Sequence, residues 1–255
     1  MTAPWLEVAD IRRSFGGVPA VDGTSLTVSP GEIVGLIGPN GSGKSTTVNI
    51  ISGTLRCDSG RVTVLGEDLT NRPSHVVARR GLARTFQIPR VWGGMTVAEN
   101  LLVAGTPHTD ESVVRAVFSR SRLRREKAAI EQRLLEILEV LGLSDVATEY
   151  AGTLSGGQKR LLEFGRIMIS GTRVLVLDEP LAGVNPVMCR KLQDVVERFR
   201  DDGCAVLLIE HNLQAVEETA DRVIVMALGK VIAQGSLASL RSSREVVTAY
   251  LGEAS

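Results

Sequence analysis

The run GPNGSGKST at residues 38–46 constrains the fold of this chain more than any other stretch of its sequence. It fits the pattern GxxxxGK[ST], which ends here on Lys44 and Ser45. The apolar stretch EIVGLIG precedes it, and STTVNIISG, which has the composition of a helix, follows it. A glycine loop between a strand and a helix lets backbone N–H groups and the positive end of the helix surround a phosphate. We therefore expect Lys44 to reach the outer phosphates of a nucleotide and Ser45 to hold Mg²⁺.

The overall composition limits the partners that such a site could serve. The chain has 255 residues, with 29 Lys and Arg against 29 Asp and Glu, and only 4% of its residues are aromatic. No net charge attracts polyanions, and few rings are available to stack on bases. We therefore expect no nucleic-acid partner.

Cysteine usage and the lengths of the apolar runs indicate a cytoplasmic protein. Cys57, Cys189 and Cys204 are far apart and form no CxxC motif, which is typical of unpaired thiols in a reducing compartment. The N-terminus lacks a cationic start followed by an apolar core, and segments such as CAVLLI are too short to cross a bilayer. We expect any contact with a membrane to be made through partner subunits.

The order of the predicted elements indicates an α/β fold. Alternating stretches near the start, LEVADI and TSLTVS, and the later RVTVLGEDL are typical of strands. From residue 172 onward, RVLVLDEP, CAVLLIE and RVIVMAL alternate with helical patterns, and such apolar strands indicate a parallel sheet covered on both faces. A helix-rich block interrupts this alternation. Within it, EKAAIEQRLLEILEVLGL predicts an amphipathic helix that ends at Gly142, after a basic run, SRSRLRREK, expected to be solvated.

Two of the predicted parallel strands end in side chains that can bind a metal ion or transfer a proton. Asp178 and Glu179 end RVLVLDE, and His211 follows VLLIE. Ligands of open α/β sheets bind at the carboxyl ends of the strands, so these side chains should lie near the glycine loop. There, Asp178 could bind the Mg²⁺ shell and Glu179 could orient and deprotonate an attacking water. His211 is expected to contact the terminal phosphate.

A second glycine-rich motif, LSGGQ at residues 154–158, narrows the interpretation. With GPNGSGKST before it and LDEP after it, the motif order resembles that of the ATP-binding-cassette (ABC) ATPases over essentially the whole chain. The other matches are Gln87 in RTFQ, the strand VLVLDEP and the histidine of IEH. Phe15, in RRSFGG, matches the aromatic residue that such proteins stack on adenine; the alternative is a core residue at a strand end.

The resemblance implies a P-loop NTPase fold of the ABC ATPase type. Its mainly parallel, RecA-like core would comprise residues 1–90 and 170–255 and include an N-terminal antiparallel β subdomain. An inserted α-helical subdomain that carries the signature would span about residues 91–169.

The resemblance also implies that two cassettes, identical or related, pair head to tail around ATP. The residues implied to bind the nucleotide of the same chain are Phe15, Gly38, Pro39, Asn40, Gly41, Ser42, Gly43, Lys44, Ser45 and Thr46. Those implied to bind the nucleotide of the partner chain are Ser155, Gly156, Gly157 and Gln158. Ser45, Gln87 and Asp178 would hold Mg²⁺, with Gln87 also near the attacking water. Glu179 would be the general base and His211 would clamp the γ-phosphate.

Several stretches resemble one branch of this family, the ATPase subunits of branched-chain amino-acid importers, whose pattern is largely shared by importers of urea and other amides. They are RRGLARTFQIPRVWGGMTVAENLLVA, LAGVNP, LLIEHNLQAV and the ending VVTAYLGE. This resemblance implies transmembrane permease partners and a place on the inner face of the cell membrane. The alternatives are a lipid or lipopolysaccharide export ATPase and a soluble ATPase for iron–sulfur cluster assembly. Asn185 stands where many cassettes carry aspartate, which leaves the usual cross-dimer aspartate contact open.

Overall fold

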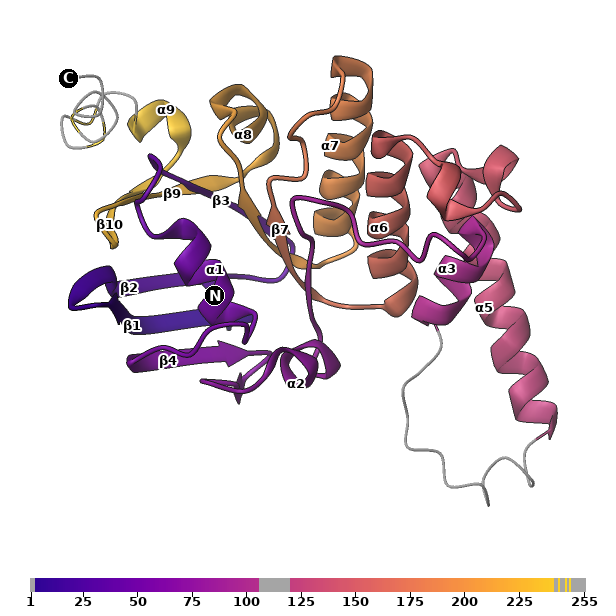
Figure 1. The fold of residues 1–255 in the computed structure, drawn as a ribbon, viewed down its shortest axis with the longest axis horizontal. Coiled ribbons are helices and arrows are strands. Elements are labelled where there is room, and N and C mark those ends of the chain that lie inside the picture. Colours follow the sequence, from indigo (N-terminus) through magenta and orange to yellow (C-terminus); the bar gives the residue numbers. More distant parts are fainter. Residues whose placement is uncertain (1–2, 106–119, 241–242, 244–245, 247, 249–255) are drawn as a thin grey trace. The chain divides into compact units, whose positions relative to one another are not determined.

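The computed structural model describes residues 3–105, 120–240, 243, 246 and 248 (Figure 1). The chain divides into two compact units, one made of residues 1–87 and 172–255 and the other of residues 88–171. Most of the ending VVTAYLGE, and the side chains of the run SRSRLRREK, lie outside the described residues.

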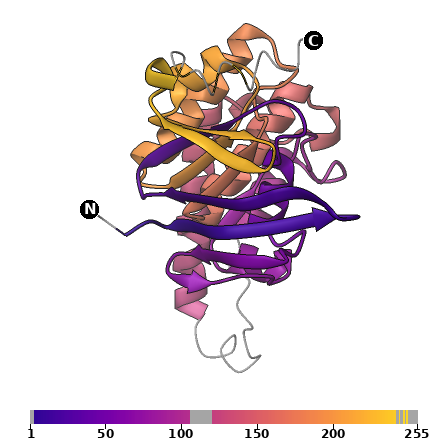
Figure 2. The same cartoon turned by 90° about the vertical axis from the view of Figure 1, so that its left-hand side faces the viewer.

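The first unit contains an antiparallel sheet of four strands in the order β2-β1-β4-β5. Its strands are β1 (Leu6–Phe15), β2 (Val18–Val28), β4 (Ser59–Val64) and β5 (Glu67–Asp68). Figure 2 shows β1 and β2 side by side, joined by the short turn at Gly16 and Gly17. The strands expected from LEVADI, TSLTVS and RVTVLGEDL are thereby confirmed.

The same unit contains a second sheet of six strands in the order β10-β9-β3-β8-β7-β6. Its strands are β3 (Glu32–Ile37), β6 (Leu82–Arg84), β7 (Val174–Asp178), β8 (Ala205–Ile209), β9 (Arg222–Ala227) and β10 (Lys230–Gly235). All neighbours are parallel except β10, which pairs with β9 in antiparallel fashion. The parallel sheet is confirmed, and its central strands β7 and β8 are buried along their whole length.

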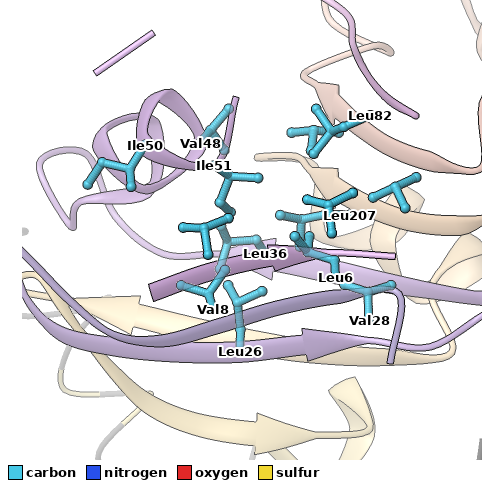
Figure 3. Packing of buried hydrophobic residues seen from close by; sticks show 14 of the residues in the cluster. Leu6, Val8, Leu26, Val28, Leu36, Val48, Ile50, Ile51, Leu82 and Leu207 are labelled. Atoms are coloured by element: carbon cyan, nitrogen blue, oxygen red, sulfur yellow. The ribbon is translucent and has the colours of Figure 1, made fainter. Parts of the chain in front are cut away.

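Apolar side chains join the two sheets around the helix that follows the glycine loop. The helices of this unit are α1 (Lys44–Ile51), α2 (Ser74–Arg79), α7 (Pro186–Asp201), α8 (Leu213–Thr219) and α9 (Leu237–Leu240). Figure 3 shows Val48 and Ile51 of α1 in one cluster with Leu6 of β1, Leu36 of β3 and Leu207 of β8. All five side chains are fully buried or nearly so, which fixes α1 against both sheets.

The second unit is helical and contains α3 (Val97–Gly105), α5 (Arg120–Leu141) and α6 (Gly156–Ser170), with 3₁₀ turns at Ser144–Val146 and Ala151–Thr153. The expected amphipathic helix is confirmed in α5, where Leu134, Leu138 and Leu141 are buried and Gly142 follows in the left-handed region. A Cβ added at Gly165 of α6 would lie 2.6 Å from a methyl group of Leu141, so the glycine allows these two helices to pack closely. No helix among the described residues is long and apolar enough to cross a membrane.

Candidate functional site

Apart from Phe15, the predicted site residues of the first unit come from one edge of the six-stranded sheet. Strands β3, β8, β7 and β6 are consecutive neighbours and run parallel, so their carboxyl ends lie at the same edge. The residues that follow them are the glycine loop after β3, His211 after β8, Glu179 after β7 and Gln87 after β6. The topology therefore brings together segments that are far apart in the sequence.

The glycine loop has a backbone that tolerates no larger residue at two of its positions. Gly38 has φ 152°, and a Cβ there would lie 2.2 Å from the carbonyl oxygen of Met226. Gly43 has φ 100°, and its Cβ would lie 2.6 Å from the carbonyl oxygen of Ala20. The packing of β9 and β2 against the loop thus requires glycine at both positions.

Lys44 begins α1 and holds the loop in its compact form. Its Nζ donates to the carbonyl oxygens of Gly38, at 2.6 Å, and Pro39, at 2.8 Å, and lies 3.3 Å from Oγ of Ser42. Gly43 is the N-cap of α1, and no side chain caps this end of the helix. The helix start, with Ser45 exposed beside it, therefore combines N–H groups and a cation in an arrangement that can bind an anion.

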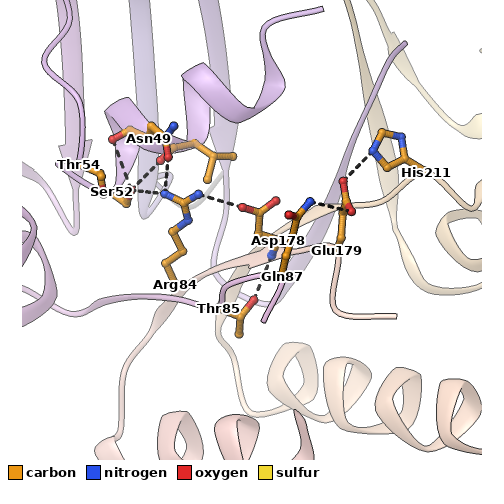
Figure 4. A network of polar contacts seen from close by, with 10 residues as sticks. Asn49, Ser52, Thr54, Arg84, Thr85, Gln87, Asp178, Glu179 and His211 are labelled. Carbon is orange, nitrogen blue, oxygen red and sulfur yellow. Dashed lines mark hydrogen bonds and ion pairs between the residues drawn. The ribbon is translucent and has the colours of Figure 1, made fainter. Parts of the chain in front are cut away.

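Asp178, at the end of β7, is bound by an arginine that the sequence reasoning had not singled out. Its Oδ2 accepts from Nη2 of Arg84 at 2.9 Å, and its backbone N–H donates to Oγ1 of Thr85 at 3.0 Å (Figure 4). Nη1 of Arg84 donates to Oδ1 of Asn49 at 2.7 Å and to Oγ of Ser52 at 2.9 Å. Arg84 thereby joins α1 to the tip of β7. No cluster of three or more His, Cys, Asp or Glu side chains that could hold a metal ion occurs among the described residues.

Glu179 lies between a histidine and an amide. Its Oε1 is 2.7 Å from Nε2 of His211, and its Oε2 accepts from Nε2 of Gln87 at 3.0 Å (Figure 4). Glu179 has φ 48°, in the left-handed region that non-glycine residues rarely adopt, although a proline follows it. Strain of this kind at a charged residue is typical of functional sites. The structure thus brings three predicted catalytic side chains into direct contact.

Glu210, directly before His211, is a buried carboxyl group beside this trio. Burial raises its pKa, and the charge of Glu179 acts in the same direction. Its Oε1 accepts from the N–H of Leu181 at 2.8 Å, so it connects the end of β8 to the loop that follows Glu179. Sequence reasoning missed this residue because its partner is a backbone group.

Phe15 is about half exposed at the end of β1, so the alternative of a core residue is wrong. The guanidinium carbon of Arg13 lies 5.0 Å from the centroid of its ring. Asp58 holds this arginine, with Oδ1 2.7 Å from Nη1, and also accepts from the N–H of Ser14 at 2.8 Å. The ring therefore stands at the surface on a strand end fixed by ionic contacts.

In the second unit, the LSGGQ residues form the start of α6. Ser155 is the N-cap, and Gln158 completes a capping box. The Ser155 hydroxyl accepts from the N–H of Gln158 at 3.3 Å, while Oε1 of Gln158 accepts from the N–H of Ser155 at 3.0 Å and from its hydroxyl at 2.9 Å. Gly156 and Gly157 form the first turn of a 15-residue helix whose N–H groups can bind an anion.

Asn185 has a local structural role. It is the N-cap of α7, and its Oδ1 accepts from the N–H of Met188 at 2.8 Å, with Pro186 in the first turn. Aspartate would cap the helix equally well, so capping alone does not explain why asparagine stands here.

The chain matches known proteins over its whole length. Residues 21–182 match the profile of the ABC transporter family. The chain is 38% identical to the "High-affinity branched-chain amino acid transport ATP-binding protein BraF" of Pseudomonas aeruginosa, with 100% of both chains covered. It is 36% identical to the corresponding LivG protein of Escherichia coli, also with 100% of both covered. A probable LivG protein of Archaeoglobus fulgidus is 39% identical over 97% of this chain and 95% of its own length.

Solved structures show the same fold. A nucleotide-free ATP-binding cassette from an ABC transporter superposes with a TM-score of 0.81 at 36% identity, covering 97% of this chain and 99% of its own. The ADP conformation of an ATP-binding cassette of an ABC transporter also superposes with a TM-score of 0.81, at 37% identity, covering 98% of this chain and 100% of its own.

Proposed function

The chain belongs to the ABC transporter family, as an ATP-binding subunit with the ATPase fold, and on that premise we propose that it powers the import of branched-chain amino acids or related small amides. The observation that carries the substrate class is the 36–39% identity, over nearly whole chains, to proteins named for branched-chain amino acid transport. These relatives lend no support to lipid export or iron–sulfur cluster assembly.

We infer that the glycine loop and α1 bind the phosphates of ATP. Apart from Pro39, which has no N–H, the loop residues from Gly38 to Thr46 supply N–H groups, and Lys44 would exchange its bonds to loop carbonyls for bonds to the outer phosphates. Ser45 and Asp178 supply hard oxygen donors of the kind that Mg²⁺ prefers, and Gln87 would add a third. A site with only these few protein ligands is suitable for Mg²⁺, because this ion keeps several of its waters and also binds the phosphates of the substrate. When bound, the metal would neutralise charge on the phosphates.

Glu179 is our candidate for the general base of hydrolysis. Its contacts with His211 and Gln87 fix both carboxylate oxygens at the sheet edge where the phosphates would end. A fixed carboxylate can orient a water and accept its proton. His211 is about half exposed, so its ring can reach both Glu179 and a terminal phosphate.

We propose that the LSGGQ residues act on the nucleotide of a second cassette. Ser155 and Gly156 are exposed, Gly157 and Gln158 are half-buried, and the helix start can receive an anion. A second copy or a related chain would then complete each site, with Phe15 stacked on the adenine of its own chain. We also propose that the chain divides by function into a nucleotide-binding core and a helical subdomain that carries the signature.

Exposed apolar side chains in the second unit support a permease partner. We define the 92–150 surface as Trp92, Met95 and Tyr150, which are 41%, 37% and 60% exposed. A backbone hydrogen bond from Ala151 to Met95 and a bridge between Thr96 and Tyr150 hold their segments together. Such exposed apolar groups are typical of interaction sites. We propose that a transmembrane subunit docks here, on the inner face of the membrane.

The test is affinity purification of the tagged chain from detergent-solubilised membranes. We expect a transmembrane protein to co-purify with the wild type and to be lost from the variant Met95→Asp/Tyr150→Asp, while ATP binding persists. Leu135→Asp, at an exposed leucine of α5, is the matched control and should retain the partner. Recovery of a soluble scaffold without any transmembrane protein would refute the importer function.

A further inference from the structure

We propose that Arg84 is a positioning residue that couples the phosphate-binding helix to the metal-binding carboxylate. This inference rests on the proposed function, because it assumes that Asp178 serves Mg²⁺. Nothing in the family comparisons assigns a role to Arg84. Its hydrogen bonds are all within the first unit and are drawn in Figure 4. Its guanidinium carbon also lies 5.2 Å from the centroid of the Phe86 ring.

The two terminal nitrogens of Arg84 bind two different elements, while its buried Nε has no hydrogen-bond partner among the described residues. Nη1 binds Asn49 and Ser52, on and just after α1, at 2.7 and 2.9 Å, whereas Nη2 binds Oδ2 of Asp178 at 2.9 Å. The Arg84 and Asp178 side chains are only 11% and 12% exposed, so these contacts are largely shielded from water. A planar fork with several fixed donors can make this bridge, and a lysine ammonium of shorter reach cannot reproduce its geometry.

The two carboxylate oxygens of Asp178 differ in their contacts. Oδ2 is the acceptor for Arg84, while Thr85 holds the backbone N–H of the same aspartate at 3.0 Å. With the main chain and one carboxylate oxygen held, the orientation of the carboxylate is restricted, and Oδ1 is the oxygen left for a metal shell. Because Arg84 is anchored on α1, the orientation of this oxygen depends on the helix that carries Lys44 and Ser45.

The same short segment also reaches the other carboxylate. Arg84 binds Asp178 and Gln87 binds Glu179, so residues 84–87 contact both acidic residues of the site. The family resemblance implies a role for Gln87 in the site, but it implies none for Arg84. We infer that Arg84 sets the metal oxygen in place before the metal arrives, which lowers the ordering cost of binding it.

The experiment compares Arg84→Lys with wild type by thermal unfolding in ATP, first with EDTA and then over a MgCl₂ titration. Lysine keeps the positive charge, so a change cannot come from relief of repulsion between the arginine and the metal. We expect the MgCl₂ concentration for half-maximal stabilisation to rise at least about fivefold, as the loss of a charge-assisted hydrogen bond predicts. In EDTA, the ATP concentration that gives half-maximal stabilisation should stay within about twofold of the wild-type value. In hydrolysis assays, kcat at fixed low MgCl₂ should fall while KM for ATP at saturating MgCl₂ is retained.

A second variant separates positioning from folding. Asn49→Ala leaves Arg84 and Asp178 intact and removes the 2.7 Å hydrogen bond that anchors Arg84 on α1, and we expect the same direction of change with a smaller size. An unchanged magnesium requirement in both variants, or an equal loss of stabilisation in EDTA, would overturn the inference. Asp178→Asn tests the assumption beneath it. If that variant has a wild-type magnesium requirement, or if the wild type does not respond to ATP and MgCl₂, the proposed metal site fails instead.

Discussion

Oε1 of Glu179 lies 2.7 Å from Nε2 of His211, and the opposite oxygen of the same carboxylate accepts a hydrogen bond from Gln87. These three residues come from the ends of three parallel strands that are neighbours in one sheet. The carboxylate is therefore held from both sides in a strained main-chain conformation.

This arrangement predicts the effect of Glu179→Gln. The amide keeps an oxygen that can accept from Gln87 but cannot take a proton from water. We expect the rate of phosphate release to fall by about 10²-fold or more while ATP binding is retained. Phosphate release and a fluorescent-nucleotide titration measure the two properties. Glu139→Gln, at an exposed position of α5, is the control and should hydrolyse ATP normally; equal rates in the two variants would remove Glu179 from the mechanism.

Gly156 offers a test of the proposed contact with a second cassette. A Cβ at this position would meet nothing within 4 Å, and its φ is not positive. Gly156→Ala should therefore leave the free energy of unfolding unchanged or raise it by about 0.5 kcal/mol, since alanine is the better helix residue. ATP hydrolysis should nevertheless fall, because the methyl group would stand where a partner's nucleotide binds. Urea unfolding and turnover are measured on the same sample, and full activity would refute the contact in trans.

Phe15 should contribute to binding of the nucleotide base. Its ring is 48% exposed, with Arg13 near one part of it. Loss of a stacked base predicts that Phe15→Ala weakens ATP binding about tenfold, whereas Phe15→Trp retains it. Val18→Ala, an exposed residue across the same hairpin, is the matched control. If Phe15→Ala binds ATP as tightly as this control does, adenine does not stack here.

Glu210 predicts a dependence of stability on pH. Burial raises its folded-state pKa above the ordinary value of 4.5. The folded protein therefore holds this proton more tightly than the unfolded chain, and the contribution is fully present below pH 4.5. It is lost as the pH rises through the folded pKa.

Glu210→Gln should remove this loss while keeping an oxygen for the N–H of Leu181. At each pH we compare the midpoint of thermal unfolding of the variant with that of the wild type. We expect this difference, variant minus wild type, to increase from pH 4.5 to pH 8. Glu149→Gln, at an exposed carboxylate, should give a difference that does not change in this way. A constant difference for Glu210→Gln would contradict the raised pKa.

The sequence was sufficient for those features whose chemistry is local. The glycine loop was predictable because Gly38 and Gly43 serve one continuous turn, and α5 because its buried leucines repeat at helical spacing. The strands β7 and β8 were predictable from their apolar runs. The placement of Asp178, Glu179 and His211 at the ends of these strands was predictable because ligands of parallel sheets bind at the carboxyl ends of the strands. The roles of the site residues remain predictions, whereas the family membership is confirmed.

The features that could not be predicted depend on contacts between distant segments. Arg84 lies 94 residues before Asp178 and 35 after Asn49. The pairing of β6 with β7 brings Arg84 near Asp178, and the packing of α1 against the sheets brings Asn49 within reach. Strand β6 itself has three residues, too few for a periodic pattern. Glu210 binds a backbone N–H, which leaves no side-chain signature to search for.

The capping box at Ser155 has a thermodynamic consequence for assembly. The Ser155 hydroxyl and the Gln158 side-chain amide already bond each other, so these two side chains are paired before any partner arrives. Binding a phosphate in trans would be an exchange of hydrogen-bond partners with little net gain for Ser155. If a second cassette pairs here as proposed, two chains without nucleotide would gain little from contact through these side chains, and the association would be reversible on each turnover. In the proposed pair, side chains that are already bonded within their own helix would make the association depend on the ATP between the chains.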